Sequence, residues 1–363
     1  MIRTGTGNLL SAEVDALVNT VNCAGVMGKG IALQFKKAWP AMFRAYQVAA
    51  RAGELRPGQV LVWQTGQLGP PRFIFNFPTK RHWKQPSRLE DIDAGLVDLV
   101  AKIRELGVRS VAIPPLGAGN GGLDWVDVRP RIVDALRDLT EVDVWLWEPG
   151  DAPPPAQQPV NTERPRWTPA RAAVIALMGQ YRILDDDLTQ LEIQKLAYFL
   201  QESGHDLRLN YARQVYGPYA DELYHLLHRL EGHFLHGLVD RRPEAVLQVE
   251  HEAVEEASRF LDQEHDVQPR FQRVARLIEG FETPYGMELL ATVHWVAKEE
   301  PAARTDPEVA LRAVQAWSAR KRSQMRPSHV RTAWQRLRDQ GWLESLEATP
   351  TSIGPATVEV HGS

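Results

Sequence analysis

The stretch that decides the fold of the N-terminal half is Ser110-Val-Ala-Ile-Pro-Pro-Leu-Gly-Ala-Gly-Asn-Gly-Gly-Leu-Asp-Trp125. Its first four residues form a short apolar run with β-branched members, which predicts a buried strand. Four glycines follow before a helical pattern starts at Trp125. A strand, a glycine-rich loop and a helix in this order are typical of an α/β sheet, whose ligands bind beyond the carboxyl ends of the strands. Such a loop leaves backbone amides accessible to an anion.

A second glycine-bearing loop lies upstream, in Asn19-Thr-Val-Asn-Cys-Ala-Gly-Val-Met-Gly-Lys-Gly-Ile-Ala32, after a strand candidate over 16–21. Either loop alone is a weak signal, because glycine clusters also serve tight turns. Neither loop ends in the Gly-Lys-Ser/Thr of a Walker A motif, and the first lacks the Gly-x-Gly-x-x-Gly spacing of a dinucleotide fold. Phosphoryl and hydride transfer therefore lose support, and the two loops together predict a site for a diphosphate-linked nucleotide.

The remaining patterns divide the chain into two folded parts. Further strands are predicted over 60–64, 72–77 and 142–147, and helices over 30–50, 88–106 and 125–139, so residues 1–148 form an α/β domain. Six prolines from Pro149 to Pro165 predict an extended linker over 149–165. Residues 166–345 are predicted to be mostly helical, over 170–181, 187–203, 220–230, 252–260, 270–281, 287–298, 308–320 and 328–338. A loosely ordered tail is expected over 346–363.

Composition narrows the function classes. The chain has 363 residues, of which 44% are hydrophobic and 24% charged, as in a folded globular protein of two or three domains. It has no apolar run of about 20 residues and no signal-peptide core, so we expect a cytoplasmic protein. A single cysteine, Cys23, excludes an internal disulfide and a cysteine-rich zinc cluster. Because 42 basic residues nearly balance 46 acidic ones, nucleic-acid contact would need a local patch.

Four segments in this order resemble the macrodomains, a family of ADP-ribose-binding α/β domains. They are Val18-Asn-Thr-Val-Asn22, Gly28-Lys-Gly-Ile-Ala32, Asn76-Phe-Pro-Thr-Lys80 and Gly117-Ala-Gly-Asn-Gly-Gly-Leu-Asp-Trp125. Within that family they are similar to the DarG antitoxins, which remove the ADP-ribose that a DarT toxin attaches to thymidine bases of DNA. The resemblance covers about residues 1–148. It implies a mixed sheet flanked by helices, ADP-ribosylated single-stranded DNA as substrate, ADP-ribose as product, and no cofactor or metal.

The resemblance also implies roles for individual residues. It places the diphosphate between the two glycine loops and Asn22 beside the distal ribose, although Asn22 could instead pin its own turn. Asn8 stands where many macrodomains carry the acidic residue that holds the adenine amine. The full implied ADP-ribose-binding set is Asn8, Asn22, Gly28, Lys29, Gly30, Ile31, Thr79, Gly117, Ala118, Gly119, Asn120, Gly121, Gly122 and Leu123.

Lys80 is the catalytic residue that the resemblance implies. Arg81 and Lys84 nearby, with desolvation by Phe77 and Trp83, predict a lowered pKa and a larger neutral, nucleophilic fraction of its amine. Two roles stay open, attack on the anomeric carbon of the distal ribose or charged stabilisation of the departing base while water attacks. Without the resemblance, an arbitrary lysine here is a solvent-facing cation.

Two neighbouring features carry alternatives. Asp124 either assists the reaction as a carboxylate or caps the helix that starts at Trp125, and we favour the cap. The loop Lys80-Arg-His-Trp-Lys84 mixes cations with aromatic rings, a combination that binds single-stranded nucleic acid. On residue types alone, it is equally well a charged surface loop.

The helical half gives weaker signals. Ile193-Gln-Lys-Leu-Ala-Tyr-Phe-Leu200 and Tyr216-Gly-Pro-Tyr-Ala-Asp-Glu-Leu-Tyr224 resemble the SocA-like, or Panacea, antitoxin domains, which implies contact with a toxin. We expect Gly217-Pro218 to separate two helices, with the flanking tyrosines in the core. The histidines at 225, 228, 233 and 236 have helical spacing, and we favour ordinary helices over a metal site. The basic run from Trp317 to Arg338 either contacts DNA or an acidic partner, or is a solvated helix face with its tryptophans in the core.

The leading hypothesis is an antitoxin with a catalytic macrodomain and a toxin-binding helical domain. A second hypothesis is a binding module that recognises ADP-ribose and blocks the toxin by contact alone. A third keeps the hydrolase but gives it ADP-ribosylated protein as substrate.

Overall fold

The computed structural model describes residues 1–150, 157–181, 188–238, 243–263 and 266–344. The expected tail over 346–363 and residues 151–156 of the expected linker lie outside the described residues. Contacts group the chain into two compact units. The first unit consists of Met1–Trp167 with Leu227–Ala253, and the second of 168–226 with 254–363.

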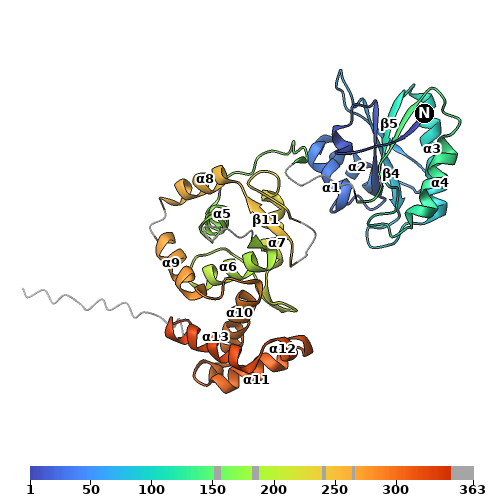
Figure 1. Ribbon diagram of the computed structural model, residues 1–363. Helices are drawn as coiled ribbons and strands as arrows, with labels where there is room; N and C mark the ends of the chain where they lie inside the picture. Colours follow the sequence, from blue (N-terminus) through green and yellow to red (C-terminus); the bar gives the residue numbers. More distant parts are fainter. Residues whose placement is uncertain (151–156, 182–187, 239–242, 264–265, 345–363) are drawn as a thin grey trace, which may run out of the picture. The chain divides into compact units, whose positions relative to one another are not determined.

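A six-stranded mixed sheet forms the centre of the first unit (Figure 1). Its strand order is β1-β6-β5-β2-β4-β3, and all neighbours are parallel except β3, which runs antiparallel to β4. The strands are β1 (Ile2–Thr4), β2 (Ala16–Asn22), β3 (Leu61–Gln64), β4 (Phe73–Lys80), β5 (Ser110–Ile113) and β6 (Asp143–Leu146). The macrodomain-like mixed sheet predicted from the sequence is confirmed. The sequence analysis missed β1, a short edge strand whose partner β6 lies far along the chain.

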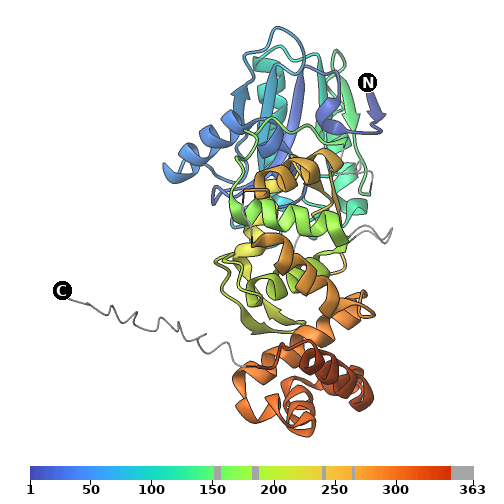
Figure 2. The same ribbon diagram turned by 90° about the vertical axis from the view of Figure 1, so that its left-hand side faces the viewer.

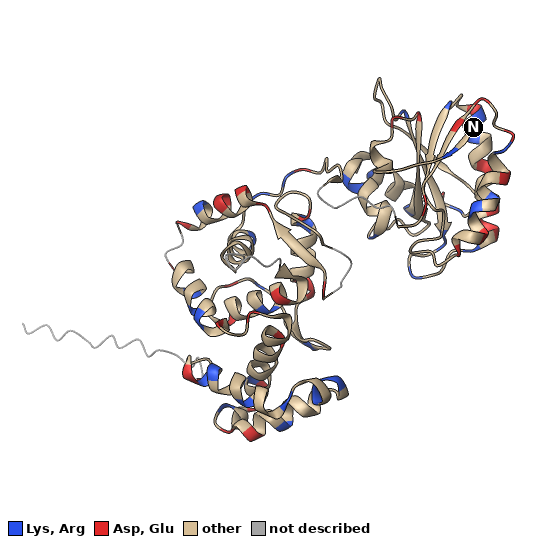
Figure 3. Ribbon diagram, in the orientation of Figure 1, with Lys and Arg blue, Asp and Glu red and all other residues tan. Residues whose placement is uncertain are grey.

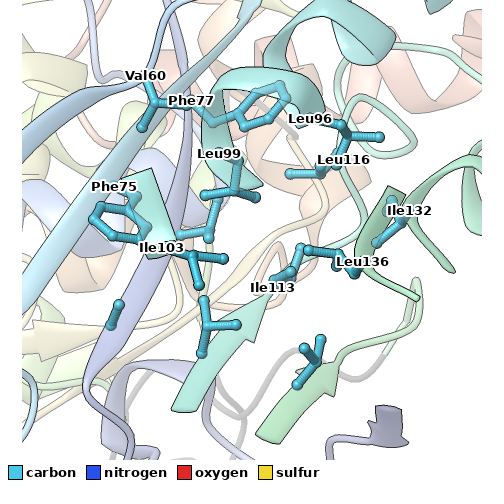
Figure 4. Close-up of a cluster of buried hydrophobic side chains, with 14 of the residues drawn as sticks. Val60, Phe75, Phe77, Leu96, Leu99, Ile103, Ile113, Leu116, Ile132 and Leu136 are labelled. Atoms are coloured by element: carbon cyan, nitrogen blue, oxygen red, sulfur yellow. The ribbon is translucent and has the colours of Figure 1, made fainter. Parts of the chain in front are cut away.

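Helices cover both faces of this sheet (Figure 1). They are η1 (Leu9–Ser11), α1 (Gly30–Ala38), α2 (Pro40–Arg51), α3 (Leu89–Glu105) and α4 (Trp125–Leu136). One core lies between the sheet and α3 and α4, and Phe75, Leu99 and Ile132 all belong to its cluster of buried side chains (Figure 4). The other core joins η1, α1 and α2 to the opposite face. Both faces of β2 are therefore buried, as expected for a central parallel strand.

One helix of the first unit differs from its prediction. We predicted a continuous helix over 30–50, but the chain breaks between α1 and α2 at Trp39. Pro40 occupies the first position of α2, where its missing N–H costs nothing, and its ring prevents the preceding helix from continuing. Both helices contribute side chains to the same core, Phe35 from α1 and Tyr46 from α2.

The second unit is mainly helical, as predicted (Figures 1 and 2). Its helices are α5 (Pro169–Tyr181), α6 (Gln190–Glu202), α9 (Val267–Ile278), α10 (Pro284–Glu299), η4 (Pro301–Arg304), α11 (Pro307–Trp317), α12 (Ala319–Gln324) and α13 (Pro327–Asp339). Helix α10 packs against α6, α11 and α13. Among the described residues, no helix is long and apolar enough to cross a bilayer.

Short strands interrupt the helices where we predicted none. They are β7 (Leu188–Thr189), the hairpin of β8 (Ala212–Gln214) and β9 (Gly217–Tyr219), and the pair β10 (Leu235–His236) and β11 (Val246–Val249). Helices α7 (Asp221–Leu230) and α8 (His251–Leu261) complete the element list. Gly217-Pro218 does lie between α6 and α7, but it forms part of the strand β9 and does not start the next helix. Tyr216 is 39% exposed at the hairpin tip and is not a core residue.

The described end of the proline-rich segment is hydrogen-bonded to the α/β domain. Asn8 donates to the carbonyl oxygen of Gln157 at 3.1 Å. The side chain of Asn161 donates to Ala38 O at 2.8 Å, and its backbone amide to Lys37 O at 2.9 Å. These bonds fix residues near 157–161 on the first unit.

Candidate active site

Three adjacent strands end at one edge of the sheet, and each leads into a predicted site segment. Strands β5, β2 and β4 are neighbours, and Asn22 at the end of β2 is paired with Lys80 at the end of β4. The amide of Cys23 donates to Lys80 O at 3.0 Å. The structure therefore brings the two glycine loops and Lys80 together where open α/β sheets bind ligands.

The first loop ends at a helix N-terminus that no side chain closes. Helix α1 begins at Gly30, and its N-cap residue Lys29 makes no side-chain capping hydrogen bond. The amides of the first turn, at Gly30, Ile31 and Ala32, have no acceptor within the helix. Together with the helix dipole, they form a place for an anion such as a diphosphate.

The second loop is a tight fold that only glycine permits. A Cβ on Gly121 would lie 2.2 Å from Gly117 O and 2.4 Å from the Ser87 hydroxyl oxygen. The amide of Ser87 donates to Gly121 O at 2.9 Å and holds the loop from behind. Within the described chain, the amides of Gly119, Asn120 and Gly121 donate no backbone hydrogen bond. They are the donors of this loop that an anion can use.

Asp124 caps α4. Its carboxylate accepts from Val126 N at 3.0 Å. The N-terminus of α4 is therefore occupied by a carboxylate, and of the two helices that follow the glycine loops only α1 presents an uncapped start. The favoured cap role of Asp124 agrees with this contact.

Lys80 lies between the loops, and its surroundings differ from those we predicted. Its ammonium donates to the carbonyl oxygen of Asn120. Burial lowers the pKa of the Lys80 amine, and the positive charge of Lys29 lowers it further. The pKa of Lys80 is lowered as predicted, but the cation that contributes is Lys29 and not Arg81 and Lys84. Arg81 is neutralised by Asp91 at 3.0 Å, and the Lys84 ammonium lies 4.8 Å from the centroid of the Trp83 ring.

Asn22 and Asn8 are engaged in local contacts. The Asn22 amide donates to Val26 O at 2.5 Å and accepts from Ala24 N at 3.0 Å. The side chain thus pins its own turn, the alternative to a ribose contact. The Asn8 side-chain oxygen accepts from Leu10 N at 3.0 Å and caps η1, which uses one of its two acceptor sites.

The other predicted binding residues fall into two groups. Gly28, Lys29, Gly30, Gly119, Asn120 and Gly122 are exposed at the loops, and Ile31, Ala118 and Leu123 are half-buried. Gly117, Gly121 and Thr79 are buried. The Thr79 hydroxyl donates to Val21 O at 3.4 Å, which makes Thr79 a part of the sheet edge.

Two residues that support the site gave no sequence signal. Tyr46 on α2 donates its hydroxyl to Asn22 O at 2.5 Å and is fully buried. Ser87 is 6% exposed beneath the second loop. Both lie far along the chain from the residues they hold, in segments whose patterns indicate only a helix and a loop.

The histidines and the basic run of the C-terminal half do not form a second site. His225 and His228 lie on α7, whereas His236 lies in β10, and the described residues contain no group of three or more metal-ligating side chains. The basic run itself contains no acidic residue, whereas α11, which precedes it, carries both signs of charge (Figure 3). Trp334 is 2% exposed, and Arg331 pairs with Glu308 at 2.6 Å. These contacts favour the interpretation as a solvated helix face, but of its two tryptophans only Trp334 lies in the core, and Trp317 is half-buried.

The chain matches known proteins over nearly all of its length. Residues 18–132 match the Macro domain family model. A DNA ADP-ribosyl glycohydrolase of Thermus aquaticus is 48% identical over 347 residues, which cover 96% of this chain and 96% of that protein. A protein of the same name from Mycobacterium tuberculosis is 44% identical over 88% of this chain and 94% of its own length. The solved macrodomain of Mycobacterium tuberculosis DarG is 58% identical over 41% of this chain and 99% of that structure, with a TM-score of 0.41.

Proposed function

The chain belongs to the family of DNA ADP-ribosyl glycohydrolases, and on that premise we propose that it removes ADP-ribose from thymidine bases of single-stranded DNA. It acts as the antitoxin to a DarT-like ADP-ribosyltransferase. The reaction is a hydrolysis in which the bond between the anomeric carbon of the distal ribose and the base breaks. Water supplies the hydroxyl group to the sugar, and its proton goes to the base.

The observation that carries this proposal is the place of Lys80. Its amine lies at the carboxyl edge of the sheet, between the uncapped start of α1 and the glycine loop after β5. A diphosphate held by the amides of these two elements leaves its attached ribose within the reach of a side chain between them. A half-buried amine with a lowered pKa suits either role that the sequence leaves open.

The chemistry of the two roles differs at the amine. As a neutral nucleophile, Lys80 forms a bond to the anomeric carbon while the base departs, and water then releases the sugar. As an ammonium, it stabilises the charge on the departing base, and water attacks directly. In both cases the glycine loops bind the diphosphate in a fixed position while the anomeric carbon of the distal ribose changes its bonding.

A side-by-side comparison of substrates tests the proposal. An oligonucleotide carrying ADP-ribose on thymidine and a protein carrying ADP-ribose on a carboxylate are incubated with the full chain. We expect release of ADP-ribose from the oligonucleotide. Release from the protein alone would contradict the DNA substrate, and ADP-ribose binding without release from either would favour a module that acts by contact.

We further propose that the helical region over residues 166–345 binds the toxin. Its resemblance to SocA-like antitoxin domains supports this role. The full chain and a variant with Lys80→Ala, which lacks turnover, are compared for protection of cells that express the toxin. We expect the Lys80→Ala chain to retain part of the protection. We expect this protection to be lost when residues 166–345 are also removed. Absence of any protection by the Lys80→Ala chain would refute the contact.

A further inference from the structure

Gly30 of the first glycine loop lies against Asn120 of the second. A Cβ placed on Gly30 would lie 2.8 Å from the side-chain nitrogen of Asn120, closer than real Cβ contacts. The Asn120 side chain therefore rests directly on the first residue of α1. Gly30 has a φ of +55°, and it is the residue that leaves room for this contact.

The same residue also holds Lys80. The carbonyl oxygen of Asn120 accepts from the Lys80 ammonium. Asn120 thus touches α1 with its side chain and Lys80 with its backbone. Its own amide donates no backbone hydrogen bond within the described chain, so these two contacts and its neighbours in the loop fix the position of the peptide.

We infer that Asn120 is a positioning residue, whose side chain braces the second loop on α1 so that its carbonyl fixes the Lys80 amine. The inference rests on the proposed function, in which Lys80 acts on the distal ribose. The brace spans the gap between the two anion-binding elements, so the placement of the amine is tied to the spacing of the loops. A displacement of about 1 Å at a reacting group can cost a large part of the rate.

A double-mutant cycle tests the brace. Gly30→Ala inserts a methyl group against the Asn120 side chain, whereas Asn120→Ala removes that side chain. Gly30→Ala is compared in the original chain and in the Asn120→Ala chain. Its backbone strain is the same in both comparisons and therefore cancels from the interaction energy. We expect Gly30→Ala and Asn120→Ala each to lower kcat by about tenfold, because either change removes the brace, and the double variant to lose no more than either single variant.

An NMR signal from Lys80 itself distinguishes a displaced Lys80 amine from a general loss of structure. Isotope-labelled methyl groups are placed on the lysine amines of the full chain, and NMR follows the Lys80 signal, assigned by its absence in Lys80→Arg. We expect the signal to shift in Gly30→Ala and in Asn120→Ala, and the double variant to show a shift no larger than that of either single variant. Additive losses in kcat, or a Lys80 signal that Gly30→Ala leaves unchanged, would overturn the inference.

A second variant avoids the inserted methyl group. Asn120→Gly removes the brace without a collision, and we expect kcat to fall about tenfold with KM changed less than about twofold, and the Lys80 signal to move. Asn210→Gly, at an exposed position in the second unit, is the matched control. If the full chain releases no ADP-ribose from DNA, the proposed function fails, whereas the Lys80 signals of these variants still decide the brace.

Discussion

At the scale of single residues, the site depends on positions where a methyl group does not fit. Gly121→Ala would push its Cβ into Gly117 O and the Ser87 hydroxyl. We expect it to weaken ADP-ribose binding and to lower the free energy of unfolding by about 1–3 kcal/mol, because the loop must open to accept the atom. Calorimetric titration and urea unfolding measure both. Gly69→Ala, which meets nothing within 4 Å, is the control. Equal behaviour of the two variants would argue against a tightly folded loop.

The pH dependence of the reaction separates the two roles of Lys80. Burial and the charge of Lys29 lower the pKa of its amine from the ordinary value of 10.5. If the neutral amine attacks, kcat rises with pH through the pKa of Lys80. If the ammonium acts, kcat falls through the same point. Lys29→Met removes a positive charge and is expected to move this midpoint to higher pH in either case. The profile is measured at a saturating concentration of the modified oligonucleotide. A midpoint that Lys29→Met leaves unchanged would contradict an effect of the Lys29 charge on the pKa of Lys80.

The sequence predicted the residue types of the site better than their contacts. Lys80 and the glycines stand where the motif places them, because short segments carry them to the ends of adjacent strands. Burial lowers the pKa of Lys80, as predicted, but the cation that lowers it further is Lys29 and not Arg81 and Lys84, and Asp91 on α3 pairs with Arg81. Such a pairing depends on how α3 packs and leaves no local pattern.

At the scale of elements, α4 is held by its cap. Asp124→Ala removes the acceptor for Val126 N, and we expect the free energy of unfolding to fall by about 1 kcal/mol while kcat is unchanged. Asp124→Asn retains the capping oxygen and is expected to keep both properties. Thermal unfolding and turnover of the modified oligonucleotide provide the readouts. A fall in kcat with either variant would instead assign the carboxylate to the reaction.

The second unit contains a buried network of charges between its elements. Glu288 on α10 accepts from Arg320 at 2.6 Å and from Lys321 at 2.7 Å. Lys195 on α6 is 1% exposed and donates to Pro218 O of the hairpin at 2.6 Å. Burial, with the nearby charge of Lys321, lowers the pKa of Lys195 to about 7.

This network predicts a pH-dependent stability of the second unit. Between about pH 7 and 10.5, the folded state holds fewer protons on Lys195 than the unfolded state, so Lys195 makes stability rise with pH in that window. Below this window the amine is charged in both states, and its burial cost is present in full. Lys195→Met should flatten the rise, as measured by urea unfolding at several pH values. Lys298→Met, at a surface ion pair with Glu202, is the control. An unchanged slope in Lys195→Met would contradict a buried titrating amine.

Elements were predictable where their pattern is local. The central strands and most helices match their predicted ranges within a few residues. The break at Pro40 was missed because apolar residues keep helical spacing on both sides of it. The hairpin of β8 and β9 was missed because three-residue strands are too short to show alternation, and Lys195 on a distant helix holds it.

At the scale of the whole molecule, an α/β unit and a helical unit each have a buried core of their own, and the sequence predicted both classes. Their extents were harder to predict, because contacts group residues 227–253 with the first unit although they follow helices of the second. The net charge of −4 carries no information about DNA, so a contact with DNA needs a local patch of the surface.

The most direct test of the central claim is turnover by Lys80→Ala on a single-stranded oligonucleotide that carries ADP-ribose on thymidine. The account predicts that this variant binds ADP-ribose as the original chain does, because the amides of α1 and of the glycine loop remain. It also predicts that release of ADP-ribose falls by about a hundredfold or more. Release at the original rate would contradict the assignment of the chemistry to Lys80.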